Sequence, residues 1–249
     1  MINKLSLEDL PRTKEILYQL CGIAGLEWHN YLCSDARDKG IYIDKCENPK
    51  GCMIVYRGSN VFIKTSSNSM LKEFIEVLDK REEHSFRCLP WIVPMIKAHF
   101  KPMKSGEEGV ILLTYYVDRA MFKKHITLGY LPEKLSEDSA EEIKTHAREG
   151  PDTEFITRRI RANSFYGIFD GGRLISWVGT LWESDDACEV GLAYTQKEYR
   201  CKGLGKTLLS IVTGRVLDKG KTPILHTIGG NIPAIKACEA VGYRLGARE

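Results

Sequence analysis

One short stretch of this sequence combines glycine with positive charge where a strand pattern gives way to a helix pattern. Residues 200–207 read Arg-Cys-Lys-Gly-Leu-Gly-Lys-Thr. Gly203 and Gly205 let the backbone come close to a ligand. The free N–H groups at a helix start favour an anion, above all a phosphate. Basic side chains flank both glycines: Arg200, Lys202 and Lys206. The stretch predicts a phosphate-binding loop, and a purely structural turn is the plainer interpretation.

Two phosphate-loop patterns compete for this stretch. Its ending, Gly205-Lys206-Thr207, matches the close of a Walker A loop, GxxxxGK[ST]. That motif requires glycine at position 200, where this chain has arginine, and an acidic strand end to hold magnesium, which residues 224–228 lack. The other pattern, [QR]-x-x-G-x-[GA], is met in full by Arg200, Gly203 and Gly205.

The elements around the loop can be read from periodicity and from capping residues. Before the loop we expect helices over 137–148 (with Ser136 as cap) and Thr153–Ala162, then strands at Phe165–Phe169, Arg173–Trp182 and Cys188–Thr195. After it we expect a helix over Gly205–Leu217, a strand at Pro223–Ile228, a helix from Asn231 to Gly242 and a strand at Tyr243–Ala247. The loop therefore joins a strand to an apolar helix.

The loop pattern, this element order, and Asn231-x-x-Ala234 followed by Gly242-Tyr243 resemble the GNAT superfamily of acyl-CoA N-acyltransferases. The resemblance covers about residues 125–249. It implies an α/β (α+β) fold with a mixed, mostly antiparallel sheet flanked by helices. It also implies binding of acetyl-CoA (coenzyme A). The implied contacts are backbone groups of Leu192, Ala193 and Tyr194, the pyrophosphate loop Arg200, Cys201, Lys202, Gly203, Leu204, Gly205, Lys206 and Thr207, and Asn231.

The resemblance also suggests catalytic residues. Glu189 stands where histone-type members place a strand-borne general base, although it could instead rim the sheet or bind a substrate ammonium. Cys238 stands where many members have the tyrosine that protonates the departing thiolate. A thiol with a pKa of about 8.5 is a weak acid for that step. Cys238 could also be a packing residue or an acyl acceptor, and Tyr194 or Tyr243 could replace it as the acid.

The first half lacks a cofactor loop. We divide the chain into residues 1–125, an α/β unit that could be a degenerate GNAT-like half, and 126–249, the acetyltransferase domain. In the first unit we expect helices within 7–35 and at Met70–Lys80, and strands at Ile41–Ile43, Met53–Arg57, Val61–Lys64 and Val110–Val117. Ile126–Leu128 would open the second unit as a strand. The chain ends about one strand short of the family, so the N-terminal half or another subunit (a homodimer) must cover the sheet edge, or it stays exposed.

Composition excludes several classes of function. The net charge is +3 without a basic stripe, so we expect no nucleic-acid partner, and Arg158, Arg159 and Arg161 are expected to form a solvated helix face. The chain has no long apolar run and no hydrophobic leader, so we expect no membrane partner. The eight cysteines form no CxxC pair and the histidines no HExxH motif, which favours reduced thiols, no metal site and a cytoplasmic protein.

These observations together predict an N-acetyltransferase that moves an acetyl group from acetyl-CoA to a primary amine. The acceptor could be a small molecule or a protein amine. The alternative is a non-catalytic acyl-CoA-binding module with the same fold, which Cys238 in place of tyrosine would favour.

Overall fold

The computed structural model of the chain describes residues 3–5, 10–21, 40–44, 49–56, 60–78, 85–88, 92–100, 112–147, 152–162 and 164–248. Predicted features at 22–35 and 104–109 lie outside these residues. The chain divides into two units, Met1–Thr114 with Gly246–Glu249, and Tyr115–Leu245. The functional boundary that we place at 125/126 stays a prediction.

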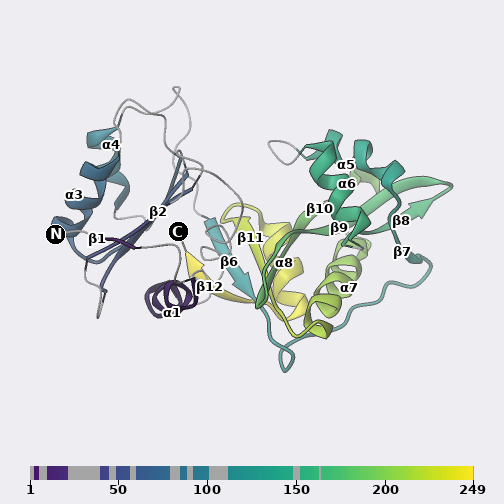
Figure 1. Cartoon of the computed structure of the whole chain (residues 1–249). Helices are drawn as coiled ribbons and strands as arrows, with labels where there is room; N and C mark the ends of the chain where they lie inside the picture. The colour runs from purple at the N-terminus through teal and green to yellow at the C-terminus, as the bar shows by residue number, and fades with distance from the viewer. Residues whose placement is uncertain are drawn as a thin grey trace. The chain divides into compact units, whose positions relative to one another are not determined.

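The first unit contains a five-stranded sheet in the order β1-β2-β3-β4-β5 (Figure 1). Its strands are β1 (Asn3–Lys4), β2 (Gly40–Ile43), β3 (Cys52–Tyr56), β4 (Asn60–Lys64) and β5 (Ser85–Cys88). Neighbours are antiparallel except β4 and β5, which run parallel and are joined through α3 (Asn68–Val77). Helix α1 (Leu10–Cys21) packs on one apolar face, whereas α3 and α4 (Val93–His99) pack on the other.

The second sheet has seven strands in the order β12-β6-β11-β10-β9-β8-β7. They are β6 (Leu112–Tyr116), β7 (Pro132–Lys134), β8 (Tyr166–Asp170), β9 (Arg173–Glu183), β10 (Ala187–Thr195), β11 (Thr222–Ile228) and β12 (Arg244–Arg248). β7 to β10 pair antiparallel in succession, and β10 pairs parallel with β11. The predicted mixed, mostly antiparallel sheet is confirmed.

Helices cover both faces of this sheet. Helices α5 (Ala140–His146) and α6 (Thr153–Arg161) pack with Phe165 and Trp177 on one face. Helix α7 (Leu204–Asp218) packs on the opposite face against β8 to β11, beside α8 (Ile232–Val241), and Figure 1 shows the two sides. Alternation along a strand therefore decides which helix layer each sheet residue meets.

Strand β6 covers the edge that we expected to be missing a partner. It lies between β11 and β12, and the Val117 N–H donates to the Pro223 carbonyl at 3.3 Å. Leu113, Thr114 and Tyr115 are all buried, as in a strand enclosed on both faces. Of the three alternatives for this edge, coverage by the stretch assigned to the first half is confirmed.

Two local predictions in the second unit are wrong. Ile126–Leu128 is not a strand. The backbone N–H of His125 and the hydroxyl of Thr127 form hydrogen bonds with side chains of α7 and not with a neighbouring strand. His125 N–H donates to Ser210 Oγ, and the Thr127 and Thr207 hydroxyls lie 2.9 Å apart. Ser136 does not cap the next helix through its side chain. The chain first makes a 3-10 turn, η2 (Glu137–Ser139), and the Ser136 hydroxyl bonds to Asp138 instead.

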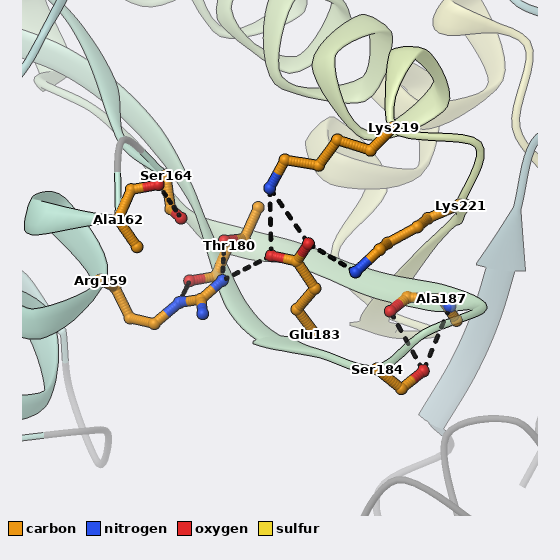
Figure 2. A network of polar contacts seen from close by, with 9 residues as sticks. All are labelled: Arg159, Ala162, Ser164, Thr180, Glu183, Ser184, Ala187, Lys219 and Lys221. Atoms are coloured by element: carbon orange, nitrogen blue, oxygen red, sulfur yellow. Dashed lines mark hydrogen bonds and ion pairs between the residues drawn. The ribbon is translucent and has the colours of Figure 1, made fainter.

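The arginine cluster of α6 is only in part a solvated face. Arg161 is 67% exposed and pairs with Glu137, as such a face predicts. Arg159 is 15% exposed, and its guanidinium donates to the carbonyl and hydroxyl oxygens of Thr180 (Figure 2). Arg159 and Arg161 are two residues apart and so point to opposite sides of α6, which the charge pattern alone does not reveal.

None of the helices among the described residues is both long enough and apolar enough to cross a membrane. The six cysteines within them are free thiols: Cys21, Cys52, Cys88, Cys188, Cys201 and Cys238.

Candidate functional site

Strands β10 and β11 separate after a short parallel ladder. They pair at three positions, the last of which joins Glu189 to Ile224. Strand β10 then continues to Thr195, still paired with β9, while β11 continues to Ile228. Beyond Glu189, no strand among the described residues pairs with the edge of β10 that faces away from β9, so a ligand could pair with its backbone as an added strand does.

A bulge changes the direction of the backbone along this open edge. Leu192 has φ 47°, and the register of β10 against β9 shifts between Gly191 and Tyr194. Bulges re-aim backbone and side-chain groups beside binding sites. The side chains of Leu192 and Tyr194 pack against the α5–α6 layer, whereas Ala193 is exposed. These three residues can therefore offer backbone groups at the open edge.

The predicted phosphate loop follows β10 after a short 3-10 turn, η3 (Lys197–Tyr199), and leads into α7. Cys201 and Gly203 both have left-handed backbone, with φ 61° and φ 85°. Such turns line up N–H groups into an anion-binding concavity. Gly203 is the N-cap of α7 and supplies no side-chain cap. The first-turn N–H groups, which begin at Leu204, are therefore left for a ligand, and the helix dipole adds to their attraction for an anion.

The side chains of the loop divide between surface and interior. Arg200, Cys201, Lys202 and Lys206 are exposed, whereas Leu204 and Thr207 are buried. The Arg200 Nε donates to the Thr195 carbonyl at the end of β10, and the Lys202 ammonium lies 4.8 Å from the centre of the Tyr199 ring. The exposed cations can neutralise a bound anion. Thr207 cannot act as a Walker A hydroxyl here, because its hydroxyl is buried against Thr127.

Thr127 packs closely against the loop at Gly203 and Thr207. A Cβ at Gly203 would lie 2.7 Å from the Thr127 hydroxyl, and φ 85° is strained for other residues. At Gly205 the nearest atom would be the Thr195 hydroxyl at 3.5 Å, an ordinary contact. Gly203 is thus required by its surroundings, whereas Gly205 is not. Sequence reasoning missed Thr127, since a threonine in an irregular segment gives no local signal.

The two residues predicted on the last helix occupy different environments. Asn231 is the N-cap of α8 and is exposed, and its Oδ1 accepts from the Ala234 N–H at 3.3 Å. Cys238 is only 1% exposed, and burial raises the pKa of its thiol to about 12. Proton transfer from such a thiol to a thiolate is uphill. Tyr243 is also buried, with its hydroxyl 2.8 Å from that of Thr213, and burial raises its pKa strongly.

Glu189 has a partner that the sequence did not indicate. Its Oε1 lies 2.9 Å from Nδ1 of His226 on β11. The two side chains are 10% and 9% exposed. Cys188 lines a small pocket with Val212 of α7, so Glu189, the next residue along β10, faces the opposite layer. His226 follows the register partner Ile224 by two residues and shares that face. The pair therefore lies where the two strands separate.

A second unpredicted group lies on the α5–α6 side of the sheet. The rings of His146, Trp177 and Tyr194 form a cluster, with centroids of His146 and Tyr194 4.5 Å apart and those of Trp177 and Tyr194 4.8 Å apart. His146 ends α5, and its Nδ1 lies 2.9 Å from the Glu142 carbonyl. The cluster packs Tyr194, and with it the open part of β10, against the helix layer.

The first unit repeats the connectivity of the site but not its open features. There, three antiparallel strands lead through α3 to a parallel strand, as β8 to β10 lead through α7 to β11. However, β4 and β5 pair along the whole length of β5. The start of α3 is closed by Ser67, whose side chain accepts from the Met70 N–H. Between the two units, only the second has both the separated strands and the uncapped helix among the described residues.

One family model and several solved structures are similar to this chain. A family model described as FR47-like protein matches residues 165–249. A Drosophila protein has a TM-score of 0.73 at 13% identity, covering 100% of this chain and 96% of that one. A GNAT-family acetyltransferase from Colwellia psychrerythraea has a TM-score of 0.60 at 16% identity, covering 100% and 97%. The chain therefore has the fold of a solved GNAT-family acetyltransferase.

A tandem GNAT protein from the clavulanic acid biosynthesis pathway also matches the chain, with a TM-score of 0.56 at 12% identity, covering 100% of this chain and 96% of that one. At these identities the solved structures establish the fold alone. A search of curated proteins finds no match. That the first unit is a degenerate GNAT-like half stays a prediction.

Proposed function

We propose that the protein is an acyl-CoA-dependent N-acyltransferase, most simply an acetyltransferase, that acts on a primary amine. The observation that carries the proposal is the unpaired edge of β10 followed, after a 3-10 turn and the glycine loop, by the start of α7, which has no side-chain cap. An extended thioester with a pyrophosphate at its far end needs these two features in this order. The free thiols of the described residues fit a reducing compartment, so we place the reaction in the cytoplasm.

The donor, coenzyme A carrying an acetyl group, would be held mainly by backbone groups. The pyrophosphate would lie on the N–H groups that follow Gly203, with the charge of Arg200 and Lys202 nearby. The amides of the pantetheine arm would pair with the edge of β10 around Leu192 and Ala193. An N–H turned outward by the bulge would bond the thioester oxygen and stabilise negative charge there.

The amine must lose a proton before it can attack the thioester. An alkyl ammonium has a pKa of about 10, so a nearby base raises the reactive fraction at neutral pH. Glu189 lies at the strand separation and faces away from α7. We assign to it the removal of this proton. The new amide bond forms as the carbon–sulfur bond breaks, and the sulfur leaves with the electron pair.

The departing thiolate does not need a protein acid. A thiol of coenzyme A has a pKa of about 8.5, so a thiolate leaves readily and can take a proton from water. Cys238, with a pKa of about 12, is a poorer acid than that thiol. We therefore favour packing as the role of Cys238, and we do not propose that Tyr243 donates the proton.

The test is a thiol-release assay with acetyl-CoA and a panel of primary amines. Glu189→Gln should lower the rate at neutral pH by about 10²- to 10⁴-fold, because it removes the base. Affinity for acetyl-CoA, measured by calorimetry, should stay close to that of the unaltered protein. Glu133→Gln, on the exposed surface of β7, is the matched control and should change neither quantity. A rate unaffected by Glu189→Gln would overturn the assignment.

A second candidate is a GNAT-fold module that binds acyl-CoA without catalysis. The burial and raised pKa of Cys238 favour it, because the usual acid position is not functional as an acid. The same assay separates the two. Binding of acetyl-CoA without acceleration of thiol release by any amine in a broad panel would support the binding module over the enzyme.

A further inference from the structure

The hydrogen bond between Glu189 and His226 joins two strands that separate at that point. In each of these residues the side chain is about nine-tenths buried, so the contact is shielded from water. A carboxylate has only acceptor oxygens, so when Glu189 is ionised the Nδ1 of His226 must carry the proton of this bond. The bond therefore selects both a tautomer of His226 and an orientation of the carboxylate.

The contact occupies one of the two carboxylate oxygens. Oε1 bonds to His226, and among the described residues Oε2 makes no hydrogen bond or ion pair. A buried carboxylate held at one oxygen has one oxygen left to accept a proton. Glutamate has three rotatable side-chain bonds, so without this contact its acceptor oxygen could take several positions. A misplacement of a reacting group by about 1 Å can slow a reaction by about 10²-fold.

We propose that His226 is a positioning residue for Glu189, and this rests on the proposed N-acyltransferase function. His226 holds Oε1, which leaves Oε2 to receive the proton of the substrate ammonium. In that step an N–H bond of the ammonium breaks, an O–H bond forms at Oε2, and the electron pair stays on nitrogen for attack on the thioester. His226 itself touches neither the amine nor the thioester in this scheme.

If the contact between Glu189 and His226 had a purely structural role, substitutions would affect stability and rate differently. If the bond only joined β10 to β11, removing it would lower stability, and its effect on the rate would not depend on Glu189. If His226 acts through Glu189, its effect on the rate must vanish once the carboxylate is gone. A double-mutant cycle measures this dependence directly.

The kinetic test compares two substitutions of His226, one that removes the N–H donor and one that keeps it. His226→Leu removes the hydrogen bond and should lower kcat by about 10- to 100-fold, with KM for acetyl-CoA unchanged. His226→Asn places an amide N–H near the former Nδ1 and should restore most of kcat. In a Glu189→Gln background, His226→Leu should cause no further loss. An equal loss in both backgrounds, or no loss in either, would overturn the proposal.

A second measurement does not depend on turnover. In the unaltered full-length protein, ¹⁵N-edited NMR should show a proton on Nδ1 of His226 with a downfield shift, which moves upfield in Glu189→Gln. An unprotonated Nδ1 would overturn the proposal, because Glu189 would then be the donor and could not act as a base. If the bond is present but no amine is acylated by the unaltered protein, the proposed function fails instead, and the positioning role fails with it.

Discussion

At the scale of single residues, the second unit contains two carboxylates that pair with cations in very different surroundings. Glu183, at the end of β9, is contacted by Lys221 at 2.7 Å, Lys219 at 3.0 Å and Arg159 at 3.8 Å (Figure 2). Burial alone would raise the pKa of Glu183, but the hydrogen bonds from Lys221 and Lys219 outweigh it and hold the pKa below its usual value. Glu137 pairs with the exposed Arg161. The first carboxylate should therefore matter for stability far more than the second.

Glu183→Gln should lower the free energy of unfolding by about 1–3 kcal/mol at neutral pH, because the partly buried Lys221 and Arg159 and the exposed Lys219 lose their counter-charge. A lowered native pKa gives stability that is present above the unfolded-state pKa and is lost as the pH falls through the native value. The difference between variant and unaltered protein should thus shrink below about pH 4. Denaturant unfolding across pH measures it. Glu137→Gln is the control, and an equal effect there would contradict the argument.

At the scale of elements, helix α7 has a left-handed glycine at each end. Gly203 precedes its first turn with φ 85°, and Gly220 follows its last with φ 74°. Substituting alanine at either position forces a side chain into left-handed backbone, which costs about 1–2 kcal/mol. Only the first position lies at the proposed phosphate site, where a Cβ would also meet Thr127. Comparing substitutions at Gly203 and Gly220 therefore distinguishes the effect of backbone strain from an effect on ligand binding.

Gly203→Ala and Gly220→Ala should both lower the melting temperature, but only Gly203→Ala should weaken binding of acetyl-CoA. The physical reason is that the added methyl displaces the N–H groups at the start of α7. Gly203→Val should weaken binding further. Calorimetric titration at a temperature where both variants are folded measures the affinity. Retained affinity in Gly203→Val would show that this loop is not the phosphate site.

The elements that the sequence predicted well are those with local signals. The glycine pattern of the loop, the cap at Asn231 and the stop at Gly242 act within a few residues, and all three lie as expected. His226 could not be predicted, because a histidine within a strand has no spacing pattern, and its partner Glu189 is remote in sequence. The burial of Arg159 depends likewise on Thr180 and Glu183. What the sequence missed are contacts between strands or between a helix and a strand.

At the scale of the whole molecule, β6 precedes residue 125 in the sequence but is a strand of the seven-stranded sheet. It lies between β11 and β12, although it precedes the helices α5 and α6 in sequence. Its apolar run predicted a strand, but the choice of neighbour depends on the global sheet and not on local pattern. We therefore expect the stretch that contains β6 to be needed for the stability of the seven-stranded sheet.

A fragment of residues 126–249 should therefore be unstable, because removing β6 leaves both β11 and β12 without their common neighbour. Unsatisfied strand edges aggregate, and buried residues such as Leu113 and Tyr115 would leave a gap in the sheet. A fragment of residues 112–249 restores β6 and is the matched comparison. We expect it to unfold more cooperatively and to remain soluble at higher concentration than the shorter one, measured by circular dichroism and light scattering. A soluble 126–249 fragment that unfolds cooperatively and binds coenzyme A would contradict the requirement for β6.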